Sequence, residues 1–318
     1  MWENFKKNFI QKDGRVVDPH NHNITHTESI GYTLYFSYKM DDKEVFNKVY
    51  NWSKNNLVKN ESGLMGWKWG RDRKKRCWCM LDLTSASDAN LWIAYSLYLM
   101  YERTGEFSYK KDADSLIDAI KKHQIISVNN ETFLLSWEKK LIGSDAIQLN
   151  PSYLIFEIFE YMAKKDKDII WNKLIKSSIL LLKKARFSSL ELNSDWVIYN
   201  LREDRYYLPL KHKLFGYDAI RVPLNIMRSN LPLYEKRALL KPYKNYIDMM
   251  PRVPLGVANL ETGEISIYNL SFGHLAVYQK IEQIFNIDRT LFRKKLEDRI
   301  EDDDDDYYAY SLYLLTIL

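Results

Sequence analysis

The chain has 318 residues, of which 46% are hydrophobic and 28% charged, and its formal net charge is +5. These are ordinary values for a globular protein, so they argue against a disordered chain, and no apolar run is long enough for a bilayer-spanning helix. Nine Trp and 23 Tyr exceed what a core of this size usually needs. Their rings combine an apolar face with a polar edge, which suits contact with sugar rings.

Helical periodicity dominates, and two kinds of helical segment alternate along the chain. The first kind is Lys-rich and apolar on one face only: residues 2–9, 42–57, 110–123, 169–184, 233–246 and 288–298. The second kind is rich in aromatic residues and opens on a polar or Gly-containing motif: residues 28–40, 88–102, 152–162, 218–227, 272–279 and 307–317. Because one-sided helices belong at the surface and the second kind can be buried more completely, the alternation predicts an all-α fold, an α/α barrel of outer and inner helices.

The starts of the aromatic-rich segments are mostly about sixty residues apart, which is a loose internal repeat. No linker rich in Pro, Gly or Ser interrupts the series, so residues 1–318 are predicted to form a single domain. Inner helices of such a barrel run parallel. We therefore expect Glu28, Asp88, Tyr153 and Asp218, which open four of them, to share one rim.

Three acidic motifs lie at these predicted helix starts: Thr27-Glu28-Ser29-Ile30-Gly31-Tyr32, Ser85-Ala86-Ser87-Asp88-Ala89-Asn90-Leu91-Trp92 and Gly216-Tyr217-Asp218-Ala219-Ile220-Arg221. Each carboxylate has a simpler interpretation. Glu28 could favour the helix dipole, Asp88 could cap its helix, and Asp218 could pair with Arg221 three residues later. Gathered in one cleft, however, they include the paired acid and base that cleave a glycosidic bond, so we interpret the chain as a polysaccharide hydrolase.

The segment 64–70 has no strong helical period and carries Trp67 and Trp69 between Gly residues. Two interpretations stay open for it: a hydrophobic plug over the end of the barrel, or a platform for sugar rings.

Other clusters give weaker signals. Cys77 and Cys79, separated by one residue, are expected to be free thiols, because a bridge between them would be strained. The basic run 71–76 is expected to be a solvated loop rather than a phosphate-binding site, since no nucleic-acid module surrounds it. The acidic run 301–306 is likewise expected to be solvated, with a calcium site as the less favoured alternative.

No metal site is predicted. The cluster His20, His22 and His26 has no rigid ligand spacing and is interpreted as a polar loop. No hydrophobic leader follows Met1, so an export signal or anchor is expected to be absent from this sequence.

The motifs around Asp88 and Asp218 make the chain resemble glycoside hydrolase family 8, and within it the cellulases that accompany bacterial exopolysaccharide and cellulose synthases. The resemblance runs from Trp2 and the segment 13–18 to Tyr307 and Tyr308. It implies an (α/α)6 barrel and an inverting endo-β-1,4-glucanase that acts on cellulose or a cellulose-like exopolysaccharide and needs no cofactor.

The resemblance also implies roles for residues. Glu28 matches the general acid, Asp218 the base that activates water, and Asp88 the carboxylate that holds the hydroxyls of the distorted sugar. Substrate contacts are expected from Trp67, Tyr153, Tyr217, Arg221, Tyr307 and Tyr308. The chain departs from the family pattern at Ser29 and Ile30, where a Gly and a polar residue are expected, and at Asn90, where most members carry Asp.

The expected partner is therefore a β-1,4-linked polysaccharide or oligosaccharide, and the resemblance also suggests association with an exopolysaccharide synthase system. No nucleic-acid partner is expected, and the protein is expected to be a monomer that is secreted, periplasmic or anchored at the cell surface. Two alternatives stay open: a glycan-binding protein on the same barrel that has lost turnover, and the same hydrolysis directed at xylan or chitosan.

Overall fold

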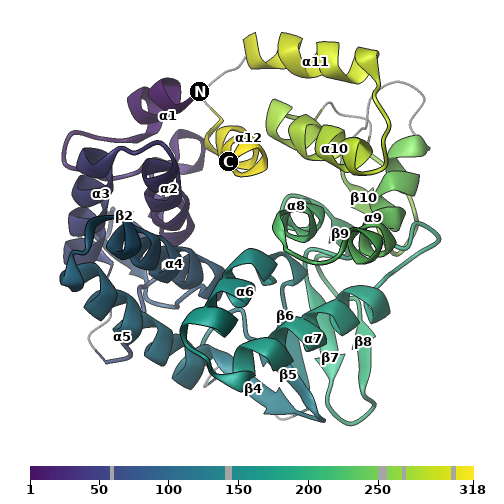
Figure 1. The fold of residues 1–318 in the computed structure, drawn as a ribbon, viewed down its shortest axis with the longest axis horizontal. Helices are drawn as coiled ribbons and strands as arrows, with labels where there is room; N and C mark the ends of the chain where they lie inside the picture. The colour runs from purple at the N-terminus through teal and green to yellow at the C-terminus, as the bar shows by residue number, and fades with distance from the viewer. Residues whose placement is uncertain (58–60, 140–144, 250–255, 267–269, 302–305) are drawn as a thin grey trace.

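A computed structural model describes residues 1–57, 61–139, 145–249, 256–266, 270–301 and 306–318. The described helices are α1 (Trp2–Phe9), α2 (Thr27–Lys39), α3 (Lys43–Asn56), α4 (Ser87–Thr104), α5 (Phe107–Gln124), α6 (Phe156–Lys165), α7 (Ile169–Lys184), α8 (Arg221–Arg228), α9 (Leu233–Asp248), α10 (Phe272–Ile284), α11 (Thr290–Glu301) and α12 (Tyr307–Ile317). Figure 1 shows the even-numbered helices forming an inner ring and the odd-numbered helices lying outside it. The predicted alternation is confirmed.

Burial follows the same division. Inner helix α2 buries side chains all round, with an uninterrupted buried run from Ser29 to Ser37, whereas outer helix α3 buries one face, built on Phe46, Val49 and Trp52. Adjacent inner helices approach closely where α2 meets α4. A Cβ on Gly31 would lie 2.7 Å from the Cβ of Trp92, so glycine is required at this contact.

Short strands occupy the connections that lead from an outer helix to the next inner helix: β1 (Thr25–His26), β2 (Lys68–Asp72), β3 (Cys77–Asp82), β4 (Ile125–Val128), β5 (Glu131–Leu134), β6 (Ala146–Leu149), β7 (Val197–Asn200), β8 (Arg205–Tyr207), β9 (Leu214–Phe215) and β10 (Ala258–Asn259). They pair antiparallel in small sheets ordered β1-β2-β3, β4-β5, β6-β7-β8 and β10-β9. These connections place the sheets at the end of the barrel where the inner helices begin.

The β2–β3 hairpin corrects one prediction and refines another. Cys77 and Cys79 form a disulfide, so the prediction of free thiols is wrong. Residues two apart in a strand project from the same face, and the two Cα atoms are 5.7 Å apart, within the usual range for a disulfide. The basic run 71–76 is the end of β2 and the turn of this hairpin, and Arg71 and residues 73–76 are exposed.

Among the inner helices, two begin three or more residues later than predicted. The segment expected to begin a helix at Ser152 first forms a 3₁₀ turn, Pro151–Tyr153, and α6 starts at Phe156. Asp218 lies in a turn, and α8 begins three residues later at Arg221. The acidic run 301–306 lies largely outside the described residues.

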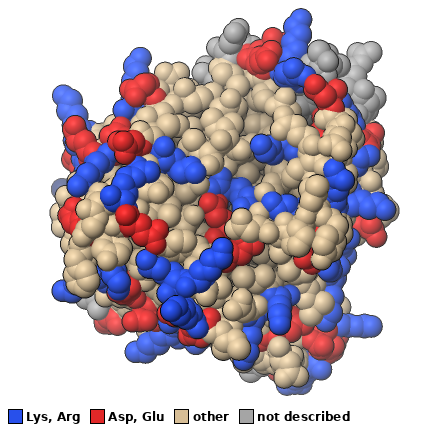
Figure 2. Space-filling model, viewed as in Figure 1, with Lys and Arg blue, Asp and Glu red and all other residues tan. Residues whose placement is uncertain are grey.

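Charged side chains are mixed over the face drawn in Figure 2, where Lys and Arg are interspersed with Asp and Glu. Among the helices of the described residues, none combines the length and apolar character needed to cross a membrane.

Candidate active site

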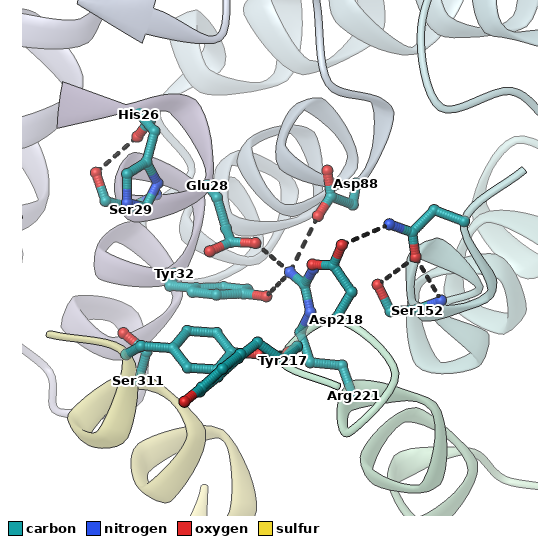
Figure 3. A network of polar contacts seen from close by, with 12 residues as sticks. His26, Glu28, Ser29, Tyr32, Asp88, Ser152, Tyr217, Asp218, Arg221 and Ser311 are labelled. Atoms are coloured by element: carbon teal, nitrogen blue, oxygen red, sulfur yellow. Dashed lines mark hydrogen bonds and ion pairs between the residues drawn. The ribbon is translucent and has the colours of Figure 1, made fainter. Parts of the chain in front are cut away.

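Three carboxylates from separate inner-helix starts converge on one guanidinium. Glu28 lies in the first turn of α2, Asp88 in the first turn of α4 and Asp218 in the turn before α8, whose first residue is Arg221. Figure 3 shows the three acidic side chains pointing toward the Arg221 side chain from different directions. The rim predicted from the helix pattern therefore exists, because parallel inner helices bring their N-terminal ends together.

The contacts of Arg221 are specific to each nitrogen. Nη1 donates to Glu28, to the Tyr32 hydroxyl at 3.0 Å and to Oδ2 of Asp88 at 3.4 Å, and Nη2 donates to Oδ1 of Asp218 at 2.6 Å. The Arg221 side chain is 4% exposed. Its planar fork is suited to binding several carboxylates at fixed angles, which a lysine ammonium could not do.

Burial distinguishes the carboxylates. The Asp88 side chain is 3% exposed, against 19% for Glu28 and 34% for Asp218. Burial, reinforced by the charge of Glu28, raises the pKa of Asp88 to about 7 despite the nearby Arg221 cation. Asp88 Oδ1 is buried and has no hydrogen-bond partner among the described residues. Asp88 can therefore hold a proton close to neutral pH and donate it in a hydrogen bond.

Asp218 is held at both oxygens. Arg221 binds Oδ1, and the Asn150 amide donates to Oδ2 at 3.1 Å. The orientation of that amide is itself fixed, because Asn150 Oδ1 accepts from the backbone N–H and the hydroxyl of Ser152, at 3.0 and 2.6 Å. The sequence analysis did not predict that Asn150 orients Asp218. The Asn-Pro-Ser sequence does indicate a turn in which the Asn side chain accepts a hydrogen bond from the backbone N–H two residues later.

The carboxylates line a cavity of about 210 Å³, which we call the acidic cavity; its walls are His26, Thr27, Glu28, Trp67, Ala86, Asp88, Tyr153, Asp218 and Arg221. A second cavity of about 560 Å³, the aromatic cavity, is lined by Trp67, Asp82, Thr84, Ser85, Ala86, Ser136, Trp137, Tyr153 and Trp196. Three wall residues are common to both, so the two cavities form one cleft. Trp67 and Tyr153, both predicted from sequence, lie where they meet.

Two further aromatic residues, missed by sequence reasoning, line the aromatic cavity. The rings of Trp137 and Trp196 are 5.6 Å apart, and Tyr153 packs edge-on against Trp196 at 6.3 Å. Both Trp lie in connections from an outer to an inner helix, and that position is the signal that could have identified them. Trp69, in contrast, is buried against Trp52. Of the two Trp in the segment 64–70, one packs in the core and the other lines the cleft.

Three predicted tyrosines, Tyr217, Tyr307 and Tyr308, are not among the residues that line either cavity. Tyr217 is 56% exposed, and the Tyr308 hydroxyl donates to the Tyr217 carbonyl. Tyr307 is 1% exposed and packs against Phe9 and His26, so its ring belongs to the core rather than to a surface that a sugar could reach.

The departures from the family pattern are accommodated locally. Ser29 donates its hydroxyl to the His26 carbonyl at 2.6 Å and its N–H to Nδ1 of His26 at 3.1 Å, which closes the turn before α2. Asn90 is fully buried, donates to the Ala86 carbonyl at 2.7 Å and accepts from the Met65 N–H at 3.1 Å. The bond accepted from Met65 holds the 64–70 segment, and the bond donated to Ala86 is one that an ionised carboxylate could not make.

None of the His, Cys, Asp and Glu side chains that the structure describes forms a group of three or more able to hold a metal ion. His20 and His22 are exposed, and His26 caps α2.

Comparison with known proteins agrees with this geometry. The model of the glycosyl hydrolases family 8 matches residues 1–318. The chain belongs to this family. It is therefore a glycoside hydrolase, and the resemblance seen in its motifs is confirmed.

Individual relatives match over most of the chain. An endoglucanase of Cellulomonas uda is 28% identical over 87% of this chain and 75% of its own length, and an endoglucanase of Salmonella typhi is 30% identical over 76% of this chain and 66% of its own length. The crystal structure of a family 8 endoglucanase from Klebsiella pneumoniae superposes with a TM-score of 0.87 at 26% identity, covering 99% of this chain and 96% of that one. The (α/α)6 barrel is the fold of this family.

Proposed function

We propose that the protein is an inverting endo-β-1,4-glucanase that hydrolyses cellulose or a cellulose-like exopolysaccharide, with residues 1–318 acting as one catalytic domain. The observation that carries the proposal is the convergence of Glu28, Asp88 and Asp218 on Arg221 at one end of an aromatic cleft. The endoglucanases among the relatives support the choice of a glucan.

In the proposed mechanism, Glu28 is the general acid. It gives its proton to the glycosidic oxygen as the bond from that oxygen to the anomeric carbon breaks. Asp218 takes a proton from a water molecule, whose oxygen attacks the anomeric carbon from the opposite face of the ring. Arg221 and Asn150 hold the Asp218 carboxylate in one orientation. The product therefore has the inverted configuration.

Asp88 is proposed to bind the sugar at the point of cleavage. Its raised pKa leaves it partly protonated near neutral pH, so it can donate a hydrogen bond to one hydroxyl and accept from another. These bonds stabilise a distorted ring more than a relaxed one if they strengthen as the ring flattens. Because Asp88 is partly protonated, it carries less negative charge than an exposed carboxylate and repels Glu28 and Asp218 only weakly.

Endo-action is supported by the aromatic residues that line the cleft beside the carboxylates. Trp67, Trp137 and Trp196 line the aromatic cavity, and Tyr217, an exposed residue, is next to Asp218 in the chain. Sugar rings stack on such faces. A polysaccharide chain can then be held across the site and cut internally, instead of being trimmed from one end.

The test is a reducing-end assay on carboxymethylcellulose, mixed-linkage glucan, xylan and chitosan, with E28Q as the matched inactive control. We expect new reducing ends and falling viscosity with the β-glucans, and neither with the control. Activity confined to xylan or chitosan would show that one of these polymers, and not a β-glucan, is the substrate. Binding of glucan without turnover by the wild-type protein would favour the glycan-binding alternative.

We further propose that the protein works outside the cytoplasm, secreted, periplasmic or anchored at the cell surface, and that it trims polymer made by an exopolysaccharide synthase during biofilm formation. The Cys77–Cys79 disulfide supports an oxidising compartment, since such bonds are rare in the cytosol. Fractionation of the native cells should recover the protein outside the cytoplasm, and affinity purification should test for a synthase partner.

A further inference from the structure

Asp195 lies directly behind the turn that carries Asp218. It precedes Trp196 and strand β7, and its backbone N–H donates to the Leu214 carbonyl at 2.7 Å. Its side chain reaches back to the beginning of the Asp218 turn. Neither the sequence motifs nor the family resemblance drew attention to it.

Both flanks of Asp218 are bound to one oxygen of Asp195. Oδ1 accepts from the N–H of Gly216 at 3.0 Å and from the N–H of Ala219 at 2.7 Å. These two donors lie two residues before and one residue after Asp218. A single side chain thus closes the turn from behind, while Arg221 and Asn150 hold the carboxylate of Asp218 from the cleft side.

The fit at Gly216 shows that this contact is closely packed. A Cβ at Gly216 would lie 2.6 Å from Oδ2 of Asp195 and 3.3 Å from its Cγ, so any larger residue would displace the carboxyl group. The Gly-Tyr-Asp string therefore has a structural reason: glycine lets the Asp195 side chain approach the backbone of the turn.

We propose that Asp195 is a positioning residue for the general base: it fixes the backbone of the 216–219 turn and thereby the direction in which Asp218 faces the attacking water. The inference rests on the proposed role of Asp218. It concerns orientation, because Asp195 acts on the backbone of the turn and lines neither cavity.

The acceptor oxygen of Asp195, rather than its negative charge, holds the 216–219 turn in place. Burial and the charge of Asp218 raise the pKa of Asp195 to about 7, so near neutral pH it is present both as the acid and as the carboxylate. A carboxyl group keeps an acceptor oxygen in either form. An asparagine side chain, which has the same shape and an acceptor oxygen but no charge, should therefore replace it well.

The experiment compares Asp195→Ala with Asp195→Asn in steady-state kinetics on a soluble β-glucan. Displacement of a reacting group by about 1 Å can cost up to about 100-fold in rate, so we expect Asp195→Ala to lower kcat by about 10-fold to 100-fold with KM within about twofold. Asp195→Asn should retain kcat within about threefold of the wild-type value, on the same reasoning about the acceptor.

Gly216→Ala provides an independent test of the same contact. It should lower kcat in the wild-type background, where it displaces the Asp195 carboxyl, and add little in the Asp195→Ala background, where that carboxyl is gone. If Asp195→Ala does not fold, Gly216→Ala is compared with the double variant Gly216→Ala/Asp195→Asn. Both proteins should have a lower kcat than the wild type, because asparagine fills the same space as aspartate and is displaced in the same way.

Three results would overturn the inference: wild-type kcat in folded Asp195→Ala, equal loss of kcat in the Asn and Ala variants, or additive effects of Gly216→Ala and Asp195→Ala. Asp218→Asn separates this failure from failure of the proposed function. If Asp218→Asn stays active, the assignment of the base is wrong. If it is inactive while Asp195→Ala is fully active, only the positioning role fails.

Discussion

Replacement of Arg221 by alanine should destabilise the protein strongly at neutral pH and less in acid. The guanidinium compensates three carboxylates, and Asp88, at 3% exposure, cannot be compensated by water instead. Removing one partner of a buried ion pair costs about 3–5 kcal/mol in free energy of unfolding. Glu28 and Asp218 are partly exposed, so we expect a loss within that range and not a multiple of it.

The pH dependence follows from the same charges. Without Arg221, the pKa of Asp88 rises further above its unfolded-state value, because the cation that lowers it is lost while its burial remains. A folded-state pKa above the unfolded value means that the folded protein binds more protons, so its stability falls as pH rises. The cost of the substitution should therefore be larger at about pH 7.5, above the wild-type pKa of Asp88, than at about pH 4.5, where Asp88 is protonated with or without Arg221.

Urea denaturation at both pH values measures this directly, with Arg221→Lys as the matched control. The lysine variant keeps one charge but has one nitrogen in place of the two that bind Glu28 with Asp88 and Asp218, so its loss should be intermediate. An unfolding free energy for Arg221→Ala within about 1 kcal/mol of the wild type at neutral pH, or a larger difference in acid, would refute the electrostatic reasoning.

Four other predictions concern catalysis and the carboxylates. Glu28→Gln should reduce turnover of a natural β-glucan by at least about 10²–10⁴-fold while glycan binding and fold persist, as checked by calorimetry and circular dichroism; unchanged turnover would remove Glu28 from the role of acid. NMR of the first product should show the α-anomer, with the Glu28 and Asp218 carboxyl groups about 6.5–9.5 Å apart in the productive state; the β-anomer would contradict inversion. Replacing Trp67 or Tyr153 by alanine should weaken long-chain substrates more than it lowers Tm, and the reverse result would make them core residues. Asp88→Asn should become more stable relative to the wild type as pH rises from 5 to about 7, and this difference should stay constant above pH 7. The reason is that the raised pKa of Asp88 makes the wild-type protein lose stability over that pH range. A stability difference that does not depend on pH would show that Asp88 is not protonated in the folded state.

Local patterns were sufficient for much of the fold. The period of a helix is a property of a few consecutive residues, so the outer segments 2–9 and 169–184 and the inner segment 307–317 were predicted with their observed bounds. The alternation of one-sided and all-round apolar helices then predicts which ones are enclosed. Because parallel inner helices begin at one end, the meeting of Glu28, Asp88 and Asp218 was also predictable.

Other features depend on contacts between distant segments. The Cys77–Cys79 bridge required knowing that both residues lie in a strand, and the separate places of Trp67 and Trp69 required knowing how the β2–β3 hairpin sits on the barrel. The Tyr308 hydroxyl donates to the Tyr217 carbonyl in the turn that carries Asp218, whereas the ring of the preceding residue, Tyr307, is buried in the core.

The sequence by itself determined the family, the barrel and the three carboxylates, because motifs and helical periodicity are written in neighbouring residues. Only the tertiary structure decided how those carboxylates are held. Asn150 and Asp195 lie 68 and 23 positions from Asp218 along the chain, so no local pattern relates them to it. Their hydrogen bonds exist because the barrel brings the α5–α6 connection, which carries Asn150, to the same rim as the α7–α8 connection, which carries Asp195 and Asp218 and folds back on itself.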